Sequence, residues 1–283
     1  QYCWPKAEAV YPDRPGRSYV LKRLRYRLRA FLHRGLIAQF EQFINQHPFL
    51  VKLLNEHADY SYPLVYRFLD KRFNGKQRFQ AICDNLPFLP EKLTVLSAPI
   101  YKTPLSFGEV IPDFEMTLLM STHQPMEGYW VLELWHKPRN ELVYLLTFAK
   151  LGEALLISVV QGPNFDGSKE MVKQLTKTCH GLRPAYLMVE TMKALTKALG
   201  FNQLLGIPQK YQNKSRFIQS SHYVVDYDAI FAESGGQLKG YWELPLEIDR
   251  NLDDVPSKKR SMYRKRYAML DDLAKVIEET LGL

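Results

Sequence analysis

The sequence predicts an α+β protein, with a helical N-terminal region followed by a mostly antiparallel sheet and its flanking helices. Three observations predict this class. Hydrophobic residues recur at three- and four-residue steps through much of the first ninety positions, which is the period of an α-helix. From residue 115 to 161 the pattern changes to short aromatic and aliphatic runs separated by turns, which favours β-hairpins. The chain closes with a helical pattern rich in basic side chains.

The first part of the chain is expected to be all-helical. An apolar stripe runs from Leu21 to Phe31 at helical steps, and Gly35 is expected to divide residues 18–45 into two helices. Residues 1–16 are rich in proline and tyrosine and are expected to be irregular. Further helices are predicted over residues 48–57, 62–73 and 76–85.

The middle of the chain is expected to form the sheet. An antiparallel meander of four strands is followed by two helices, a short apolar strand, a polar stretch, a short helix and a final strand. The strands are predicted over residues 115–121, 127–136, 141–150, 154–161, 201–207 and 240–245. The helices are predicted over residues 168–179, 184–200 and 227–236. We therefore divide the chain into a helical N-terminal region (1–92), an α/β core (93–256) and a basic C-terminal helix packed on the core (257–283).

The basic charge is concentrated in two clusters. The chain carries a formal net charge of +8, and one cluster without an acid lies in residues 17–34 and another in residues 258–266. These clusters hold 13 of the 38 basic residues, so the rest of the chain has 25 bases against 30 acids. Such ends favour anionic partners, namely an anionic membrane surface, a phosphorylated envelope precursor or tRNA. A core helix with a solvated basic face explains the apolar stripe equally well.

Other classes of protein are not indicated. The three cysteines are far apart and lack the spacing of a metal site or a disulfide framework, so no metal is expected and a reducing compartment fits best. No run of about 18 apolar residues is present, and the first residues lack the design of a signal peptide. The expected location is cytoplasmic, peripheral to the inner membrane.

Three blocks of the sequence carry a resemblance to a known family. They are LTKTCHGLRPAYL (175–187), ALGFNQLLGIP (198–208) and SKKRSMYRKRYAMLDDL (257–273), which occur in this order. The chain resembles the VirK/YbjX family of Gram-negative bacteria. That family is associated with virulence and with resistance to cationic antimicrobial peptides through the cell envelope, so the resemblance implies a role in envelope integrity.

The order of elements from residue 127 to the segment YDAIFAESGGQLKGYWELP (227–245) also resembles the GNAT acyltransferases. That fold implies strands that splay to admit a thioester, and a glycine-rich turn that holds pyrophosphate at a helix N-terminus. The matching turn runs from His180 to Arg183 and has one glycine, Gly181, where the superfamily has a Gly-x-Gly/Ala pattern. The tyrosine that often protonates the thiolate falls near Ala232. The resemblance therefore implies an acyl thioester (CoA or acyl carrier protein) or an aminoacyl-tRNA rather than acetyl-CoA specifically.

The candidate catalytic residues are Glu133, His136 and His180. Glu133 and His136 lie on one predicted strand, where the resemblance implies a general base, but they are three residues apart and face opposite sides. At most one of them faces a site, and the alternative is an edge charge with a capped histidine. The neighbours Cys179 and His180 cannot form a catalytic pair on a helix, so Cys179 is expected to be a small buried residue.

The remaining candidates are contacts to cofactor and substrate. Gln161, Gly181 and Arg183 are expected to bind the cofactor, the first from a loop at a strand end and the others from the turn with His180. Tyr211, Asn213 and Arg216 are expected at the rim of a substrate pocket, with an ordinary loop as the alternative. For Arg183 the alternative is a surface salt bridge.

The function that we expect is an acyl- or aminoacyl-transferase that modifies a cell-envelope lipid or glycan precursor. Masking the negative charge of envelope glycolipid would give resistance to cationic peptides. Two alternatives stay open: a non-catalytic membrane-peripheral adaptor that binds anionic lipid or protein, and an aminoacyl-tRNA-dependent transferase.

Overall fold

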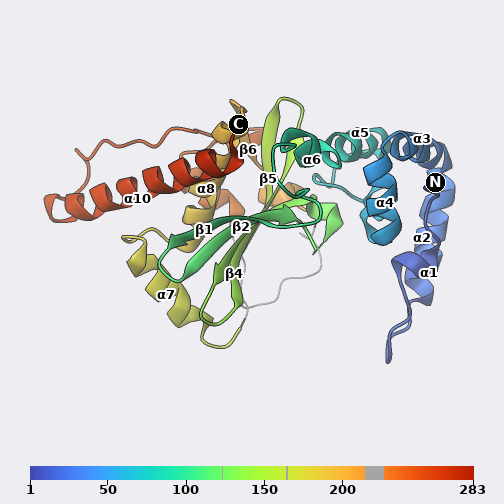
Figure 1. The fold of residues 1–283 in the computed structure, drawn as a ribbon, viewed down its shortest axis with the longest axis horizontal. Helices are drawn as coiled ribbons and strands as arrows, with labels where there is room; N and C mark the ends of the chain where they lie inside the picture. Colours follow the sequence, from blue (N-terminus) through green and yellow to red (C-terminus); the bar gives the residue numbers. More distant parts are fainter. Residues whose placement is uncertain (123, 164, 214–225) are drawn as a thin grey trace.

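The computed structural model describes residues 1–122, 124–163, 165–213 and 226–283 (Figure 1). Within these ranges one eight-stranded sheet, in the order β1-β2-β3-β4-β5-β6-β8-β7, is flanked by α-helices, and the first ninety residues are helical. The α+β class and the helical N-terminal region are thus confirmed. The N-terminal helices lie at one end of the long axis, and α10 extends toward the other (Figure 1).

The N-terminal helices largely follow the apolar periodicity. They are α1 (Ala7–Val10), α2 (Val20–Leu32), α3 (Arg34–Asn45), α4 (Pro48–Glu56), α5 (Gly75–Asn85) and α6 (Phe88–Lys92). The break in the long segment falls at His33, two residues before Gly35. The helix predicted over residues 62–73 is wrong: a 3-10 turn, Tyr62–Val65, is followed by irregular backbone that includes Leu69 at φ 57°. A residue in the left-handed region ends helical hydrogen bonding.

The sheet is an antiparallel meander with one parallel pair. Its strands are β1 (Leu105–Ile111), β2 (Phe114–Met120), β3 (Trp130–His136), β4 (Glu141–Leu151), β5 (Ala154–Gln161), β6 (Leu204–Gly206), β7 (Gln237–Lys239) and β8 (Tyr241–Leu244). β5 and β6 run parallel, and the other neighbours are antiparallel. β1 and β7 were not predicted. Both are edge strands with few buried side chains, so neither has the alternating pattern of a half-buried strand.

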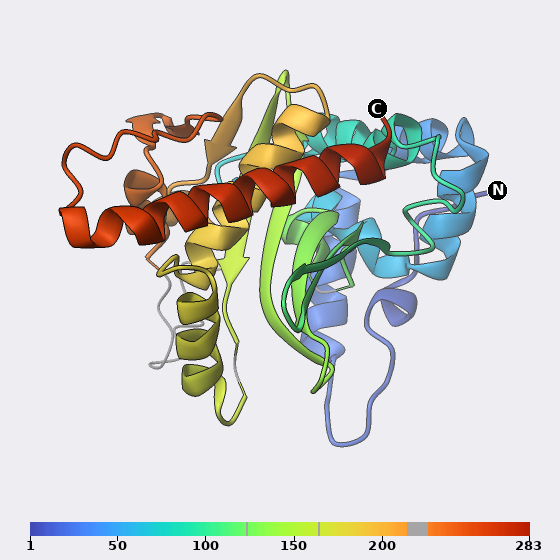
Figure 2. The same ribbon diagram turned by 60° about the vertical axis from the view of Figure 1, so that its left-hand side comes forward.

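The helices of the core pack on one face of the sheet. They are α7 (Ser168–Thr178), α8 (Pro184–Ala198), α9 (Tyr227–Glu233) and α10 (Ser257–Leu281). Figure 2 shows α10 crossing α8. Leu270, Leu273, Ile277 and Leu281 are buried at helical spacing, so this half of α10 belongs to the core. α10 lies within the range over which the basic C-terminal helix was predicted.

The two faces of the sheet bury different side chains. One face supplies the main core, with Leu132 and Leu146 at 0% exposure. The other face carries a small separate cluster of Val131, Leu145 and Val159. Because residues paired across antiparallel strands share a face, Glu133 lies on this second face beside Leu145.

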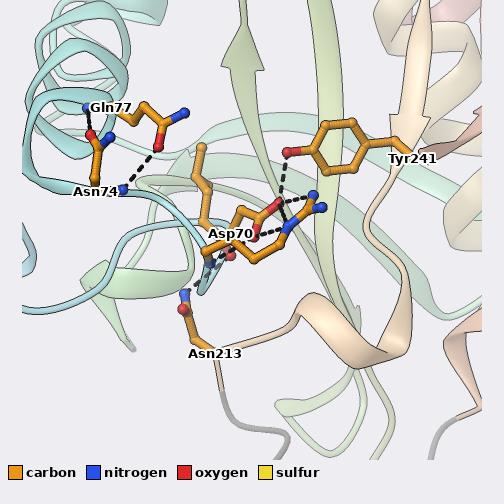
Figure 3. A network of polar contacts seen from close by, with 7 residues as sticks. Asp70, Asn74, Gln77, Asn213 and Tyr241 are labelled. Atoms are coloured by element: carbon orange, nitrogen blue, oxygen red, sulfur yellow. Dashed lines mark hydrogen bonds and ion pairs between the residues drawn. The ribbon is translucent and has the colours of Figure 1, made fainter.

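A buried carboxylate joins the helical region to the core. Asp70 has a side-chain exposure of 0%, and it accepts hydrogen bonds from Arg72 (2.7 Å) and from the Tyr241 hydroxyl in β8 (2.7 Å) (Figure 3). Burial alone would raise the pKa of the Asp70 carboxyl, but these hydrogen bonds outweigh burial and hold the pKa below its ordinary value. This contact fixes the irregular residues 66–73 against the sheet.

Candidate active site where two parallel strands part

The parallel strands β5 and β6 separate part-way along β5. They pair from Leu155 with Leu204 to Ile157 with Gly206, and the Ile207 N–H then donates to the Ile157 carbonyl oxygen at 3.0 Å. β5 continues to Gln161, whereas β6 has ended. The Val160 N–H donates to the Tyr227 hydroxyl at 3.3 Å, so a side chain from α9 fills a position that a strand backbone would otherwise take.

A β-bulge lies at the point of separation. Thr147 pairs with Val159 and Phe148 pairs with Ile157, which leaves Ser158 as an extra residue in β5. The Ser158 hydroxyl lies 3.1 Å from the Thr147 carbonyl oxygen and also contacts the carbonyl oxygen of Glu127. Because a bulge bends its strand and increases its twist, this residue explains why β5 turns away from β6. It also ties the 3-10 turn at residues 125–127 to the sheet.

A cleft of about 480 Å³ opens beside the parting strands. Its wall includes Leu145 and Thr147 from β4, Gln161 from the end of β5, and Glu127 from the preceding turn. Glu127 is only 8% exposed and contributes its carboxyl group to the wall of this cleft. The sequence-predicted residue Gln161 thus lines the cleft, whereas Glu127, which also lines it, was not predicted because it lies in no recognisable motif.

Glu133 is the most perturbed carboxyl group near the cleft. Its exposure is 4%, and among the described residues it has no hydrogen-bond or ion-pair partner. Burial raises the pKa of Glu133 to about 7. The register places Glu133 of β3, Leu145 of β4 and Gln161 of β5 side by side. Glu133 is therefore two strands away from Gln161, a distance of about 10 Å across the sheet. An acid with this pKa can hold or release a proton near neutral pH.

His136 does not join Glu133. It lies at the end of β3 in register with Phe114, on the opposite face, and its ring lies 5.0 Å from the Phe114 ring. Its Nδ1 atom is buried without a hydrogen-bond partner in the described part of the chain. The two side chains therefore face opposite sides of the sheet, as their spacing predicts.

The turn with His180 connects α7 to α8 and contacts α10. His180 and Gly181 have φ of 56° and 80°, and the His180 carbonyl oxygen accepts hydrogen bonds from the Arg266 guanidinium of α10 at 3.0 and 3.2 Å. A Cβ atom at Gly181 would lie 3.1 Å from Arg266 Nη2. Arg183 pairs with Glu233 of α9 at 3.0 Å.

These contacts do not fit a phosphate site. A pyrophosphate needs converging backbone amides at a helix N-terminus. This turn instead directs a carbonyl oxygen at Arg266 and has Arg183 already paired with an acid. The cofactor role of Gly181 and Arg183 and the catalytic role of His180 stay predictions, and the contacts of this turn do not favour a phosphate site. Neighbouring Cys179 is fully buried, and burial raises its pKa to about 12, as expected for an unreactive core thiol.

Tyr211 and Asn213, two of the residues predicted to line the rim of a substrate pocket, contact the irregular segment that contains Asp70. The Asn213 amide, shown in Figure 3, donates to the carbonyl oxygens of Leu69 (3.1 Å) and Met126 (2.8 Å). The Arg72 guanidinium lies 3.4 Å from the centre of the Tyr211 ring. Both side chains thus have structural partners. Arg216 lies outside the described residues. Among the described residues, no group of three or more potential ligands could hold a metal ion.

The chain is therefore an α+β protein built on a single sheet. A cleft opens at the end of β5, beyond the point where β5 and β6 separate, and the buried acid Glu133 lies on the same face of the sheet. The chain belongs to the family described as "Protein of unknown function (DUF535)", whose sequence model matches residues 15–279. No solved structure matches the chain.

Several relatives support the family assignment. An uncharacterized protein of Haemophilus influenzae is 79% identical over 282 residues, which is 100% of this chain and 97% of that protein. A Mannheimia haemolytica protein named "Membrane protein LapB" is 64% identical, covering 76% of this chain and 95% of its own length. The uncharacterized protein YbjX of Escherichia coli is 24% identical over 91% of this chain and 83% of its own, which confirms the VirK/YbjX resemblance. No helix among the described residues is long and apolar enough to cross a membrane.

Proposed function

We propose that the protein is an acyl- or aminoacyl-transferase that modifies an amine or hydroxyl group of a cell-envelope lipid or glycan precursor. The observation that carries the proposal is Glu133, a carboxyl group 4% exposed with a pKa raised to about 7, on the sheet face beside the cleft. Perturbed acids in clefts are typical of functional sites. We propose that the reaction takes place at the cytoplasmic side of the inner membrane.

Glu133 acts as the general base on the acceptor. As the acceptor nitrogen or oxygen bonds to the acyl carbonyl carbon, its proton passes to the Glu133 carboxylate, and the bond from that carbon to the leaving sulfur or oxygen breaks. The proton then leaves to the released group or to water. The low exposure of Glu133 keeps its proton affinity matched to neutral pH.

The donor is an activated acyl group whose carrier is recognised elsewhere than at the turn with His180. That turn is filled by Arg266, so a CoA pyrophosphate finds no cradle there. An acyl carrier protein and an aminoacyl-tRNA both offer their ester or thioester on a long arm, and both carry negative charge that suits a chain of net charge +8. An aminoacyl group on the product would add a positive charge to the envelope, so that cationic peptides would bind it less well.

The test is transfer of a radiolabelled acyl group from acyl-CoA, acyl carrier protein or aminoacyl-tRNA to a lipid and glycan extract of a Gram-negative envelope. We expect wild-type protein to transfer label and Glu133→Gln to lose at least about 100-fold in rate. Glu153→Gln is the matched control, because Glu153 is an exposed residue of the β4–β5 turn. Absence of transfer with all three donors, and of any donor retained in native mass spectrometry, would favour the non-catalytic adaptor.

A further inference from the structure

Helix α2 packs on the rest of the protein with its polar side. Tyr26 is the one buried residue among its thirteen, and its hydroxyl donates to the Pro5 carbonyl oxygen at 2.6 Å. Arg23, with a side chain 16% exposed, donates to the Tyr11 carbonyl oxygen and pairs with Asp13 at 2.8 Å. The inward face of α2 therefore carries a phenol, a guanidinium and the small side chain of Ala30, whereas a surface helix ordinarily turns its large apolar side chains inward.

The apolar face of α2 is open to solvent. Six large hydrophobic side chains on it are 57 to 68% exposed, whereas the rest of the described chain has three that are comparably exposed. The six are Val20, Leu21, Leu24, Leu28, Phe31 and Leu32. At about 100° per residue they fall within an arc of about 120°, and Tyr26 lies on the opposite side of the helix. A contiguous exposed apolar face of this kind marks an interaction surface.

Basic side chains border this face along both edges. On the same helical wheel Arg25 and Arg29 lie on one side of the apolar arc, and Arg27, which pairs with Glu8, lies on the other. No acidic residue occurs from Arg17 to Arg34. Arg25 is exposed and has no partner among the described residues, and the partly buried Arg29 rests 3.9 Å from the centre of the Tyr66 ring. The surface thus combines an apolar strip with positive charge on each side.

The second basic helix lacks this arrangement. In α10 the apolar side chains, including Leu273 and Ile277, are buried in the core. Arg266 is bound to the His180 carbonyl oxygen, and Arg260 donates to the carbonyl oxygens of Val255 and Asp253. α10 is therefore a structural helix with a charged outer side. The two basic clusters, alike in sequence, differ in what their helices expose.

We propose that α2 docks the protein on an anionic lipid bilayer, lying in the plane of the surface with its apolar face at the boundary of headgroups and acyl chains. Thirteen residues make a helix of about 20 Å, which suits an in-plane position and is too short to span the hydrocarbon core. A lipid surface is the occupant because it supplies apolar contact under the strip and phosphate groups along both edges. A protein partner would have to place acids on two opposite sides of one helix.

The test is sedimentation of the full chain with vesicles of phosphatidylcholine alone and of phosphatidylcholine with about one third phosphatidylglycerol. We expect binding to the anionic vesicles that weakens with added salt. Leu24→Ser with Leu28→Ser should weaken binding about tenfold or more, and Arg25→Gln should weaken it about fivefold. The matched controls are Leu238→Ser, since Leu238 is 54% exposed on β7, and Lys258→Gln on α10, which should leave binding unchanged.

The following results would overturn the proposal that α2 docks on a lipid surface. Wild-type protein that stays unbound to anionic vesicles, or variants of α2 that bind like wild type, would remove α2 as a lipid surface. Self-association that the double serine variant abolishes, with no vesicle binding by the wild type, would assign the face to a second copy of the chain. All substitutions lie at exposed positions, and matched thermal unfolding of each variant confirms its fold. Vesicle binding does not depend on transfer activity, so the two proposals fail separately.

Discussion

The ionisation of Glu133 should make the protein less stable as the pH rises. Its pKa is about 7 in the folded protein, against 4.5 for an exposed glutamate, so between these values the folded state holds a proton that the unfolded state has lost. The free energy of unfolding therefore falls with rising pH across this window and levels off above it. Replacing Glu133 with Gln, which has the same shape and no charge, should abolish this contribution.

The size of the effect follows from the pKa difference. Each tenfold change in proton affinity corresponds to about 1.4 kcal/mol, so a shift from 4.5 to about 7 amounts to about 3 kcal/mol of stability lost between pH 4.5 and pH 8. Solvent screening does not reduce this free energy appreciably, because Glu133 is only 4% exposed. Such a loss is a large part of the stability of a typical domain.

The assay is urea denaturation of wild type, Glu133→Gln and Glu153→Gln at several pH values from about 4.5 to 8.5. We expect the stability of Glu133→Gln relative to wild type to increase by about 3 kcal/mol over this range, while the exposed control follows wild type. Parallel pH curves for wild type and Glu133→Gln would refute the reasoning, because they would mean that Glu133 is ionised in the fold with a compensating partner.

Three further outcomes are expected. Asp70→Asn should cost about 2 kcal/mol in urea denaturation, less than a fully buried pair because Arg72 is half exposed, and an unchanged midpoint would contradict this. Gly181→Ala should destabilise by about 1 kcal/mol more than Gly152→Ala, since both residues have positive φ but only Gly181 meets Arg266 within 4 Å; equal losses would remove the packing contribution. Of the three cysteines only Cys3 is exposed, so a thiol reagent should label one thiol in the native protein and three in denaturant, and a second fast thiol would be inconsistent with the burial of the others.

Local patterns predicted most of the elements. The bounds of α10 and β5 match the predicted ranges, since α10 has a long helical period and β5 a continuous apolar run between turns. The helix expected over residues 62–73 is absent because Asp70, Tyr241 and the left-handed Leu69 hold this segment in an irregular path. That path depends on β8, about 170 residues later, and no local pattern encodes it.

The candidate site was predictable only in part. Glu133 could be proposed from its place on a meander strand, and Gln161 from its position at a strand end. Glu127 gave no signal, because the contact with the bulge at Ser158 brings it to the cleft, and the contact of Tyr227 with β5 depends on the approach of α9. The turn with His180 has the composition of an anion site, yet Arg266 from α10 occupies it.

The sequence by itself determined the α+β class, most of the strands and helices, the family and the two basic clusters, because periodicity, turn residues and charge are local properties. Only the tertiary structure decided which cluster is exposed with its apolar strip and which is packed into the core. It also decided that Glu133 is desolvated while His136 faces away. Burial is the sum of contacts from segments distant in sequence, so a solvated charge and a buried one look the same along the chain.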